Sequence, residues 1–156
     1  MKINICYTNL NRHDTYTNIS PFASPDSGFL QVDIRNLDEI CSDDEVKEIL
    51  AVDVINYLTA DDTIKSIQNW IKKLKCGGRL ILVFDDIYEI ARRIYVQILN
   101  NEEINHIIYG KQEKPYEIKR SAFPMHWLKN HILAQNTRLI KCRLDNHQAI
   151  LEVEKL

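Results

Sequence analysis

Two adjacent carboxylates, Asp85 and Asp86, follow the apolar segment 79–84. Neighbouring carboxylates can raise the pKa of one member of the pair, which suits a group that accepts a proton from a substrate or binds that substrate. The alternative is structural, because an aspartate just before Ile87 would cap a helix predicted to begin there. We therefore treat this pair as candidate catalytic residues at the end of a buried strand.

Three further polar residues belong to a second apolar segment, 49–58. Asn56 and Tyr57 lie at its end, where Asn56 can orient a substrate but cannot act as a base near neutral pH. Tyr57 is either a candidate catalytic residue or part of the core. Asp53 is flanked by apolar residues and needs partners if it is buried, so it is either a site residue or a satisfied structural group.

A predicted helix over residues 61–75 connects these two apolar segments. Its apolar residues recur at helical spacing and form one stripe, namely Ile64, Ile67, Trp70, Ile71 and Leu74. We expect Gly77 and Gly78 to end this helix, because glycine adopts a left-handed conformation at little cost. We expect parallel strands over 49–56 and 79–84. With this helix between them they form a right-handed crossover unit, which places both strand ends at one sheet edge.

The remaining pattern extends this unit into a sheet. We expect strands over 2–6, 16–19 and 29–34, helices over 87–100 and from Pro124 to about Asn136, and an antiparallel hairpin from 137–143 and 147–153. Residues 101–120 are either a functional loop or contain a short helix. The predicted fold is α/β, with a single Rossmann-like doubly wound sheet that is mostly parallel and ends in an antiparallel C-terminal hairpin.

Composition excludes several classes of function. The 156 residues carry a net charge of −2 with a pI of about 6.2, so we expect no general nucleic-acid surface. No apolar run approaches the roughly 18 residues that a membrane span needs, and the N-terminus lacks the apolar core of a signal peptide. We expect one domain over residues 1–156, no membrane association and a cytoplasmic location.

Cysteines and histidines give no pattern typical of a metal site or a disulfide framework. His126 and His131 are five residues apart, a poor match to one helix face, and no HExxH motif occurs. We therefore predict no metal site. No CxxC motif occurs either, so we expect free thiols at all four cysteines, Cys6, Cys41, Cys76 and Cys142.

The order of these segments resembles the compact class I S-adenosylmethionine-dependent methyltransferases. The matching segments are 3–6, 16–20, 32–37 and 48–58 for the first four strands, 74–80 (LKCGGRL) for the family's LKPGG.L turn, 84–87 for PDL, 109–112 for YGGQ and 120–123 for HRSGF. The resemblance covers nearly the whole chain and rests on the order of short matches. It implies S-adenosylmethionine as cofactor and methyl transfer to an unidentified acceptor.

The same resemblance implies a set of cofactor-binding residues. Cys6, Tyr7 and Thr8 stand at the family's glycine-rich turn, and Ser20 stands where an acid binds the ribose. Asp33 stands where the family places an acid near the adenine amine, although an acid at the end of a parallel strand is alternatively a turn cap or a partner for a helix end. Asp53, which precedes the candidate catalytic residues, completes the set.

The chain departs from the family at the turn and at the ribose acid. Its first glycine is Gly28, so side chains would crowd a ligand at that turn. We therefore expect S-adenosylhomocysteine to bind weakly or not at all, unless the backbone amides of residues 7–9 or the side chains of Thr8 and Arg12 compensate. The alternative function is a catalytically degenerate fold that has lost the cofactor and acts as a binding or structural module for a protein partner. Lys119 and Arg120 are either anion-binding residues or solvated surface cations.

Overall fold

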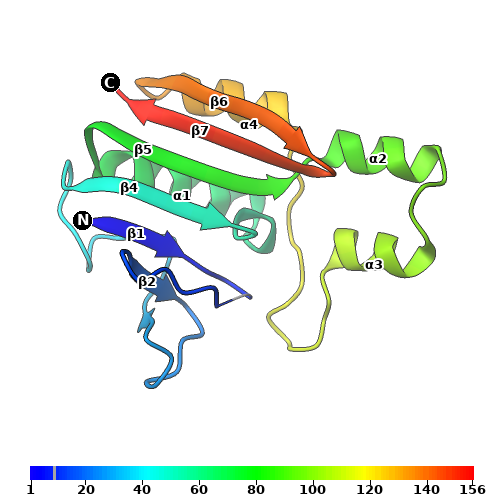
Figure 1. The fold of residues 1–156 in the computed structure, drawn as a ribbon, viewed down its shortest axis with the longest axis horizontal. Helices are drawn as coiled ribbons and strands as arrows, with labels where there is room; N and C mark the ends of the chain where they lie inside the picture. Colours follow the sequence, from blue (N-terminus) through cyan, green and yellow to red (C-terminus); the bar gives the residue numbers. More distant parts are fainter. Residues whose placement is uncertain (9) are drawn as a thin grey trace.

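A seven-stranded sheet with the order β3-β2-β1-β4-β5-β7-β6 forms the centre of the computed structural model, which describes residues 1–8 and 10–156 (Figure 1). The strands are β1 Lys2–Ile5, β2 Thr17–Ser20, β3 Leu30–Gln31, β4 Val46–Val52, β5 Leu74–Asp85, β6 Thr137–Asp145 and β7 Gln148–Lys155. The first five strands run parallel, and β7 pairs antiparallel with both β5 and β6. The predicted parallel sheet with an antiparallel C-terminal hairpin is confirmed.

Four α-helices accompany the sheet in the described part of the chain: α1 Ala60–Lys73, α2 Ile87–Tyr95, α3 Asn101–Tyr109 and α4 Met125–Leu133. Figure 1 shows α1 and α4 behind the sheet, whereas α2 and α3 extend beyond the carboxyl ends of its strands. The sheet residues that face α1 and α4 are fully buried, as at Ile49, Leu80 and Leu151. Across residues 1–8 and 10–59, the connections between strands are loops without an α-helix.

The predicted strand–helix–strand unit is present. Ile49 of β4 pairs with Leu80 of β5 in parallel, and α1 connects the two strands. The α1 N-terminus is capped by Thr59, whose side-chain oxygen accepts a hydrogen bond from the Asp62 N–H at 3.1 Å. Trp70 is 0% exposed and belongs to the core, as the apolar stripe predicted.

The predicted role of the two glycines was wrong. The α1 helix ends at Lys73, and Leu74 is already extended and pairs with Val46 of β4. Gly77 and Gly78 lie in an irregularity of β5, where the register shifts relative to β4. A Cβ atom on Gly78 would lie 2.9 Å from the carbonyl oxygen of Val46, so glycine is required there by close backbone approach.

Strand ends also differ from the prediction. The third strand contains only two residues rather than 29–34, because the chain leaves the sheet edge after Gln31. The β4 strand ends at Val52, and a 3₁₀ turn at Ile55–Tyr57 follows instead of a strand to residue 56. This turn lies at the carboxyl edge, where it presents Asn56 and Tyr57.

The later helices are shorter than expected. The α2 helix stops at Tyr95, and the segment 101–120 contains α3, so the short-helix alternative for that segment is confirmed. Pro124 is the residue that precedes α4. Ser121 does not cap this helix, since its hydroxyl donates to the carbonyl oxygen of Ile55 at 3.0 Å.

All four cysteines are free, and two of them, Cys6 and Cys41, are buried. No helix of the described residues is long and apolar enough to cross a membrane. The single domain and the cytoplasmic location stay predictions.

Candidate functional site

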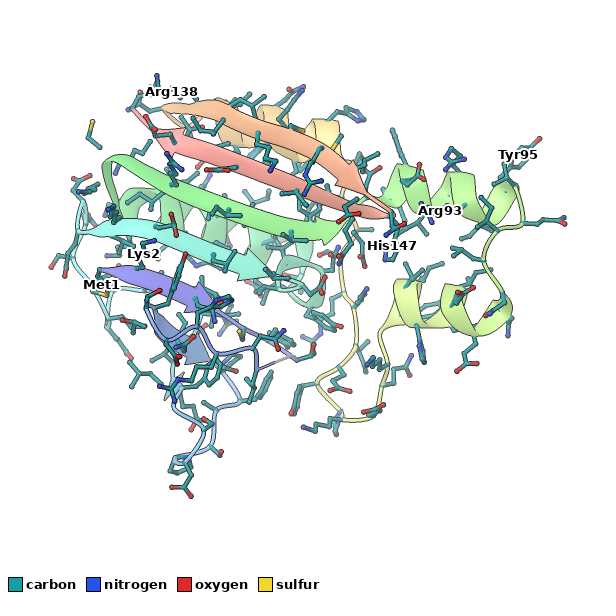
Figure 2. All side chains as sticks on the ribbon, in the orientation of Figure 1. Met1, Lys2, Arg93, Tyr95, Arg138 and His147 are labelled. Carbon is teal, nitrogen blue, oxygen red and sulfur yellow. The ribbon has the colours of Figure 1, made fainter. Side chains whose placement is uncertain are left out.

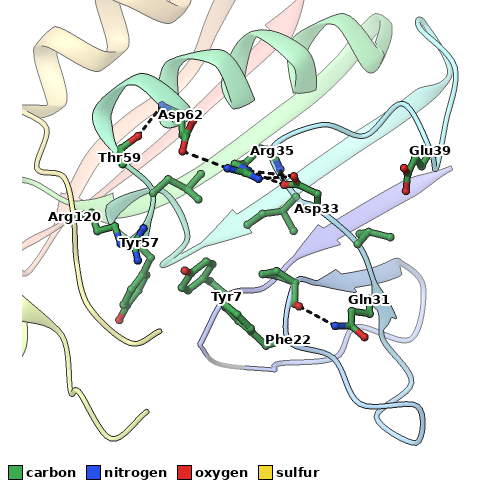
Figure 3. Close-up of a pocket in the computed structure, with 14 residues that line it drawn as sticks. Tyr7, Phe22, Gln31, Asp33, Arg35, Glu39, Tyr57, Thr59, Asp62 and Arg120 are labelled. Atoms are coloured by element: carbon green, nitrogen blue, oxygen red, sulfur yellow. Dashed lines mark hydrogen bonds and ion pairs between the residues drawn. The ribbon is translucent and has the colours of Figure 1, made fainter. Parts of the chain in front are cut away.

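The first cavity, with a volume of about 540 Å³, opens where the strand order reverses between β1 and β4 (Figure 3). Its walls come from the ends of the first four strands, through residues 21–22, 31–35 and 57–62, together with Tyr7 and Arg120. Such a reversal leaves a crevice, because the connections on its two sides lead away in opposite directions. Ligands of open α/β sheets bind in this crevice.

Aromatic rings close the first cavity at the exit of β1. Tyr7 is 8% exposed and stacks on Tyr57, which is 7% exposed, with ring centroids 5.0 Å apart. The edge of Phe22 meets Tyr7 at 5.0 Å, and Phe22 in turn stacks on Tyr116 at 3.7 Å. Burial raises the pKa of the Tyr7 hydroxyl. These rings occupy the position at which a glycine turn would leave the backbone open to a ligand.

The charged groups of the first cavity are unequally paired. The Arg35 guanidinium donates three hydrogen bonds to the Asp33 carboxylate, at 2.9, 3.2 and 2.8 Å, and lies 3.6 Å from Asp62. These bonds lower the pKa of Asp33, although partial burial opposes that change. Arg120 has no carboxylate within 4.0 Å among the described residues. Of the two arginines that line the first cavity, Arg35 forms ion pairs and Arg120 forms none with the described residues.

A second cavity of about 430 Å³ lies beside the first, and Tyr57 lines both. It is built from the ends of β4 and β5, the start of β7, the helix α3 and residues 111–119. Figure 2 shows His147 at the tip of the β6–β7 hairpin, at the carboxyl edge of the sheet. The hairpin therefore contributes to this cavity from a distant part of the sequence.

Asp85 organises the inner wall of the second cavity. Its carboxylate accepts a hydrogen bond from Lys119 and lies 3.4 Å from Nε2 of His147. Lys119 also donates to the carbonyl oxygen of Ile107 at 2.9 Å, which joins β5 to α3. Burial opposes ionisation of Asp85, but His147 and Lys119 together outweigh that effect and lower its pKa. Asp85 therefore remains an anion across the neutral range.

Asp53 lines the same cavity, but its pKa is shifted in the opposite direction from that of Asp85. Its backbone has a φ of 54°, a left-handed conformation that aspartate tolerates better than most residues. Nε2 of Gln148 donates to its Oδ1 at 2.5 Å. Burial raises the pKa of Asp53, and the nearby charge of Asp85 raises it further. A carboxylate that binds a proton more readily than usual is suited to proton acceptance.

Two of the predicted catalytic residues make structural contacts. Asn56 is 3% exposed, its Oδ1 accepts from the Asp85 N–H at 3.1 Å, and its Nδ2 donates to the Ser121 carbonyl at 3.2 Å. The Asp86 carboxylate accepts from the backbone N–H groups of Glu89 and Met125 at 3.0 and 2.7 Å. Asp86 thus caps α2, ties it to α4 and lines neither cavity.

The residues placed by the family resemblance fall into three groups. Tyr7 and Asp33 line the first cavity, whereas Thr8 and Asp53 line the second. Cys6 and Ser20 line neither. Cys6 is buried with its thiol 3.6 Å from the Asn11 carbonyl, and the hydroxyl of Ser20 accepts from the Phe22 N–H at 3.2 Å. Arg12, expected to compensate, pairs with Asp14 at 3.4 Å.

His147 and Gln148 were missed from the sequence, although both line the second cavity. The only sequence signal was the turn before them, at residues 145–146. Pairing of β5 with β7 places Gln148 opposite Asp85, and that register follows from the tertiary arrangement of two strands more than 60 residues apart.

No protein-family model matches the sequence, and no curated protein does so either. Solved structures do match. One is the protein in complex with the Haloferax volcanii Trm112 methyltransferase activator, at 10% identity, a TM-score of 0.61, and coverage of 98% of this chain and 81% of that one. Another is the Burkholderia thailandensis 1,6-didemethyltoxoflavin N1-methyltransferase with bound S-adenosylhomocysteine, at 8% identity, a TM-score of 0.62, and coverage of 99% and 70%.

Other matching structures are much longer. The chain spans 43% of a possible exported protein from Bordetella parapertussis, at 11% identity and a TM-score of 0.58 with 80% of this chain covered. The strand order and these matches agree on architecture. The chain has the fold of the class I S-adenosylmethionine-dependent methyltransferases.

Proposed function

We propose that this chain is an S-adenosylmethionine-dependent methyltransferase that binds the cofactor in the first cavity and an acceptor in the second. The observation that carries this proposal is the pair of cavities at one edge of the sheet, which share Tyr57 as a wall. Methyl transfer requires two reactants to be held in line at short distance. Adjacent cavities on a rigid sheet edge meet that requirement.

The first cavity fits the adenosyl part of the cofactor. Its volume of about 540 Å³ lies within the roughly 300–1,000 Å³ of small-molecule sites. Tyr7 and Phe22 offer aromatic surface to a base, and Asp33 and Gln31 offer hydrogen-bonding groups. When bound, S-adenosylmethionine supplies an electrophilic methyl group. Because Tyr7 replaces a glycine at the β1 exit, we expect weak affinity.

In the second cavity we assign Asp53 as the base that removes a proton from the methyl-accepting substrate. Its raised pKa supports that role. Asp85 stays ionised and holds Lys119 and His147 in place. Asn56 positions the ends of β4 and β5 through its two side-chain hydrogen bonds. These assignments involve no metal ion. The acceptor is a small molecule or macromolecule with a titratable nucleophile.

Titration with S-adenosylhomocysteine tests the proposal. We expect a dissociation constant in the high micromolar to millimolar range, weakened further by Asp33→Ala and unchanged by Asp26→Ala, an exposed aspartate outside both cavities. Absence of binding at millimolar ligand would refute the cofactor role. Binding with a dissociation constant below about 10 μM, lost in Asp33→Ala, would instead refute the expectation that the cofactor binds weakly.

One observation favours a second candidate, a binding or structural module without catalysis. Tyr7 and Tyr57 are both more than nine-tenths buried and stack on each other at the β1 exit, which reduces the room for the reactive end of a cofactor. The matching protein in complex with a Trm112 activator supports a protein as the kind of partner. Lack of S-adenosylhomocysteine binding would favour this candidate.

A further inference from the structure

Arg120 is the unpaired cation of the first cavity. The other lining arginine, Arg35, is neutralised by Asp33 at 2.8 Å and approached by Asp62 at 3.6 Å. No carboxylate lies within 4.0 Å of the Arg120 guanidinium in residues 1–8 and 10–156. A guanidinium presents a fork of donors that matches a carboxylate or phosphate. The cavity thus offers a free anion-binding group.

The backbone that carries Arg120 is hydrogen-bonded to the 3₁₀ turn that follows β4. The Arg120 and Ser121 N–H groups donate to the carbonyl oxygen of Asn56 at 2.7 and 3.2 Å. The Ser121 hydroxyl donates to the Ile55 carbonyl at 3.0 Å, and the Asn56 amide donates to the Ser121 carbonyl at 3.2 Å. Four hydrogen bonds therefore fix the backbone at residues 120–121, whereas the backbone of a free surface loop would lack such bonds.

The cavity is polarised along its length. Figure 3 shows Arg120 beside Tyr57 and Glu39 on the opposite side, with the Asp33–Arg35 pair between them. A ligand with an anionic group at one end and hydrogen-bond donors at the other has one favourable orientation in such a cavity. Its anionic end lies at Arg120.

Among the described residues of the β1 exit, 6–8 and 10–12, no unpaired cationic side chain lines the first cavity. A buried tyrosine, Tyr7, stands there instead of glycine, and it stacks on Tyr57 at 5.0 Å. Arg12 pairs with Asp14 and lines neither cavity. Thr8 lines the second cavity. Arg120 is the group that remains at this end of the first cavity.

We propose that Arg120 binds the carboxylate of the amino-acid part of S-adenosylmethionine and S-adenosylhomocysteine, in place of a glycine-rich β1 turn. This inference rests on the proposed function, which it extends to the anion-binding subsite. It assigns that subsite to the segment between α3 and α4 rather than to the N-terminal part of the sheet.

Two ligands that differ at one end test the inference. S-adenosylhomocysteine carries the amino-acid part, whereas 5′-methylthioadenosine retains the nucleoside and lacks the carboxylate. Both are titrated by NMR into the wild type, Arg120→Ala, Arg120→Lys and the matched control Arg143→Ala. Arg143 is an exposed cation of β6 that lines neither cavity. Thermal unfolding of each variant verifies that it is folded.

We expect Arg120→Ala to weaken S-adenosylhomocysteine binding about tenfold, which corresponds to 1.4 kcal/mol, and to leave methylthioadenosine binding unchanged. Arg120→Lys should have a smaller effect, and Arg143→Ala none. If Arg120→Ala affected both ligands equally, or neither, the role of Arg120 would be overturned. The proposed function would still stand as long as the wild type bound S-adenosylhomocysteine. Failure of the wild type to bind either ligand would overturn both proposals.

Discussion

Trp70 connects the stability of the core to the shape of the first cavity. Its side chain is 0% exposed, and its indole N–H donates to the carbonyl oxygen of Ile34 at 2.8 Å. Ile34 and its neighbours Asp33 and Arg35 line the cavity. This hydrogen bond from α1 therefore helps to anchor the segment that carries the paired charges of Asp33 and Arg35.

Two substitutions separate the packing of Trp70 from its hydrogen bond. Trp70→Ala removes a fully buried ring and should cost about 3–5 kcal/mol. Trp70→Phe keeps most of the apolar surface but leaves the buried Ile34 carbonyl without its donor, which should cost about 1–3 kcal/mol. Trp127→Ala is the matched control, because Trp127 is 47% exposed, and its loss should be well below that of Trp70→Ala.

Urea titration measures these differences. With a slope of about 2 kcal/mol per molar urea, a loss of 4 kcal/mol lowers the midpoint by about 2 M. The expected order of stability is wild type, then Trp70→Phe, then Trp70→Ala. A loss of unfolding free energy below about 1 kcal/mol for Trp70→Ala would refute the packing of the Trp70 ring in the core. Equal losses for Trp70→Ala and Trp70→Phe would contradict the separate contributions of the ring and its hydrogen bond.

Three further outcomes are expected. Gly78→Ala should destabilise the protein in urea titration, because the new Cβ would lie 2.8 Å from the Lys75 carbonyl; an unchanged midpoint would contradict the close approach. The folded-state pKa of Asp53 is raised, so the wild type loses stability as the pH rises from the usual aspartate pKa through the folded-state pKa. Asp53→Asn should therefore gain stability relative to the wild type as the pH rises from acid to neutral, and a constant difference would contradict the raised pKa. Labelling of unfolded, non-reduced protein should find four reactive thiols, whereas fewer would indicate a disulfide.

Local sequence pattern was sufficient for much of the fold. The apolar stripe of 61–75, the apolar segments on either side and the alternating hairpin each report on nearest neighbours in one element, so period and burial are encoded within a few residues. Boundaries were less certain, because tertiary contacts decide where an element ends. Gly78 illustrates this, since its close approach to Val46 depends on a strand more than 30 residues away.

The site depended on contacts that no local pattern contains. Asp85 and Asp86 are adjacent and chemically identical in sequence, yet one accepts from Lys119 and lines a cavity while the other binds backbone N–H groups at α2 and α4. Asp53 finds its partner Gln148 95 residues away. Residue types and strand ends predicted which side chains reach the carboxyl edge of the sheet. Only the packed structure decided which carboxylate is paired, which is raised in pKa and which is structural, because those properties come from neighbours that the fold assembles.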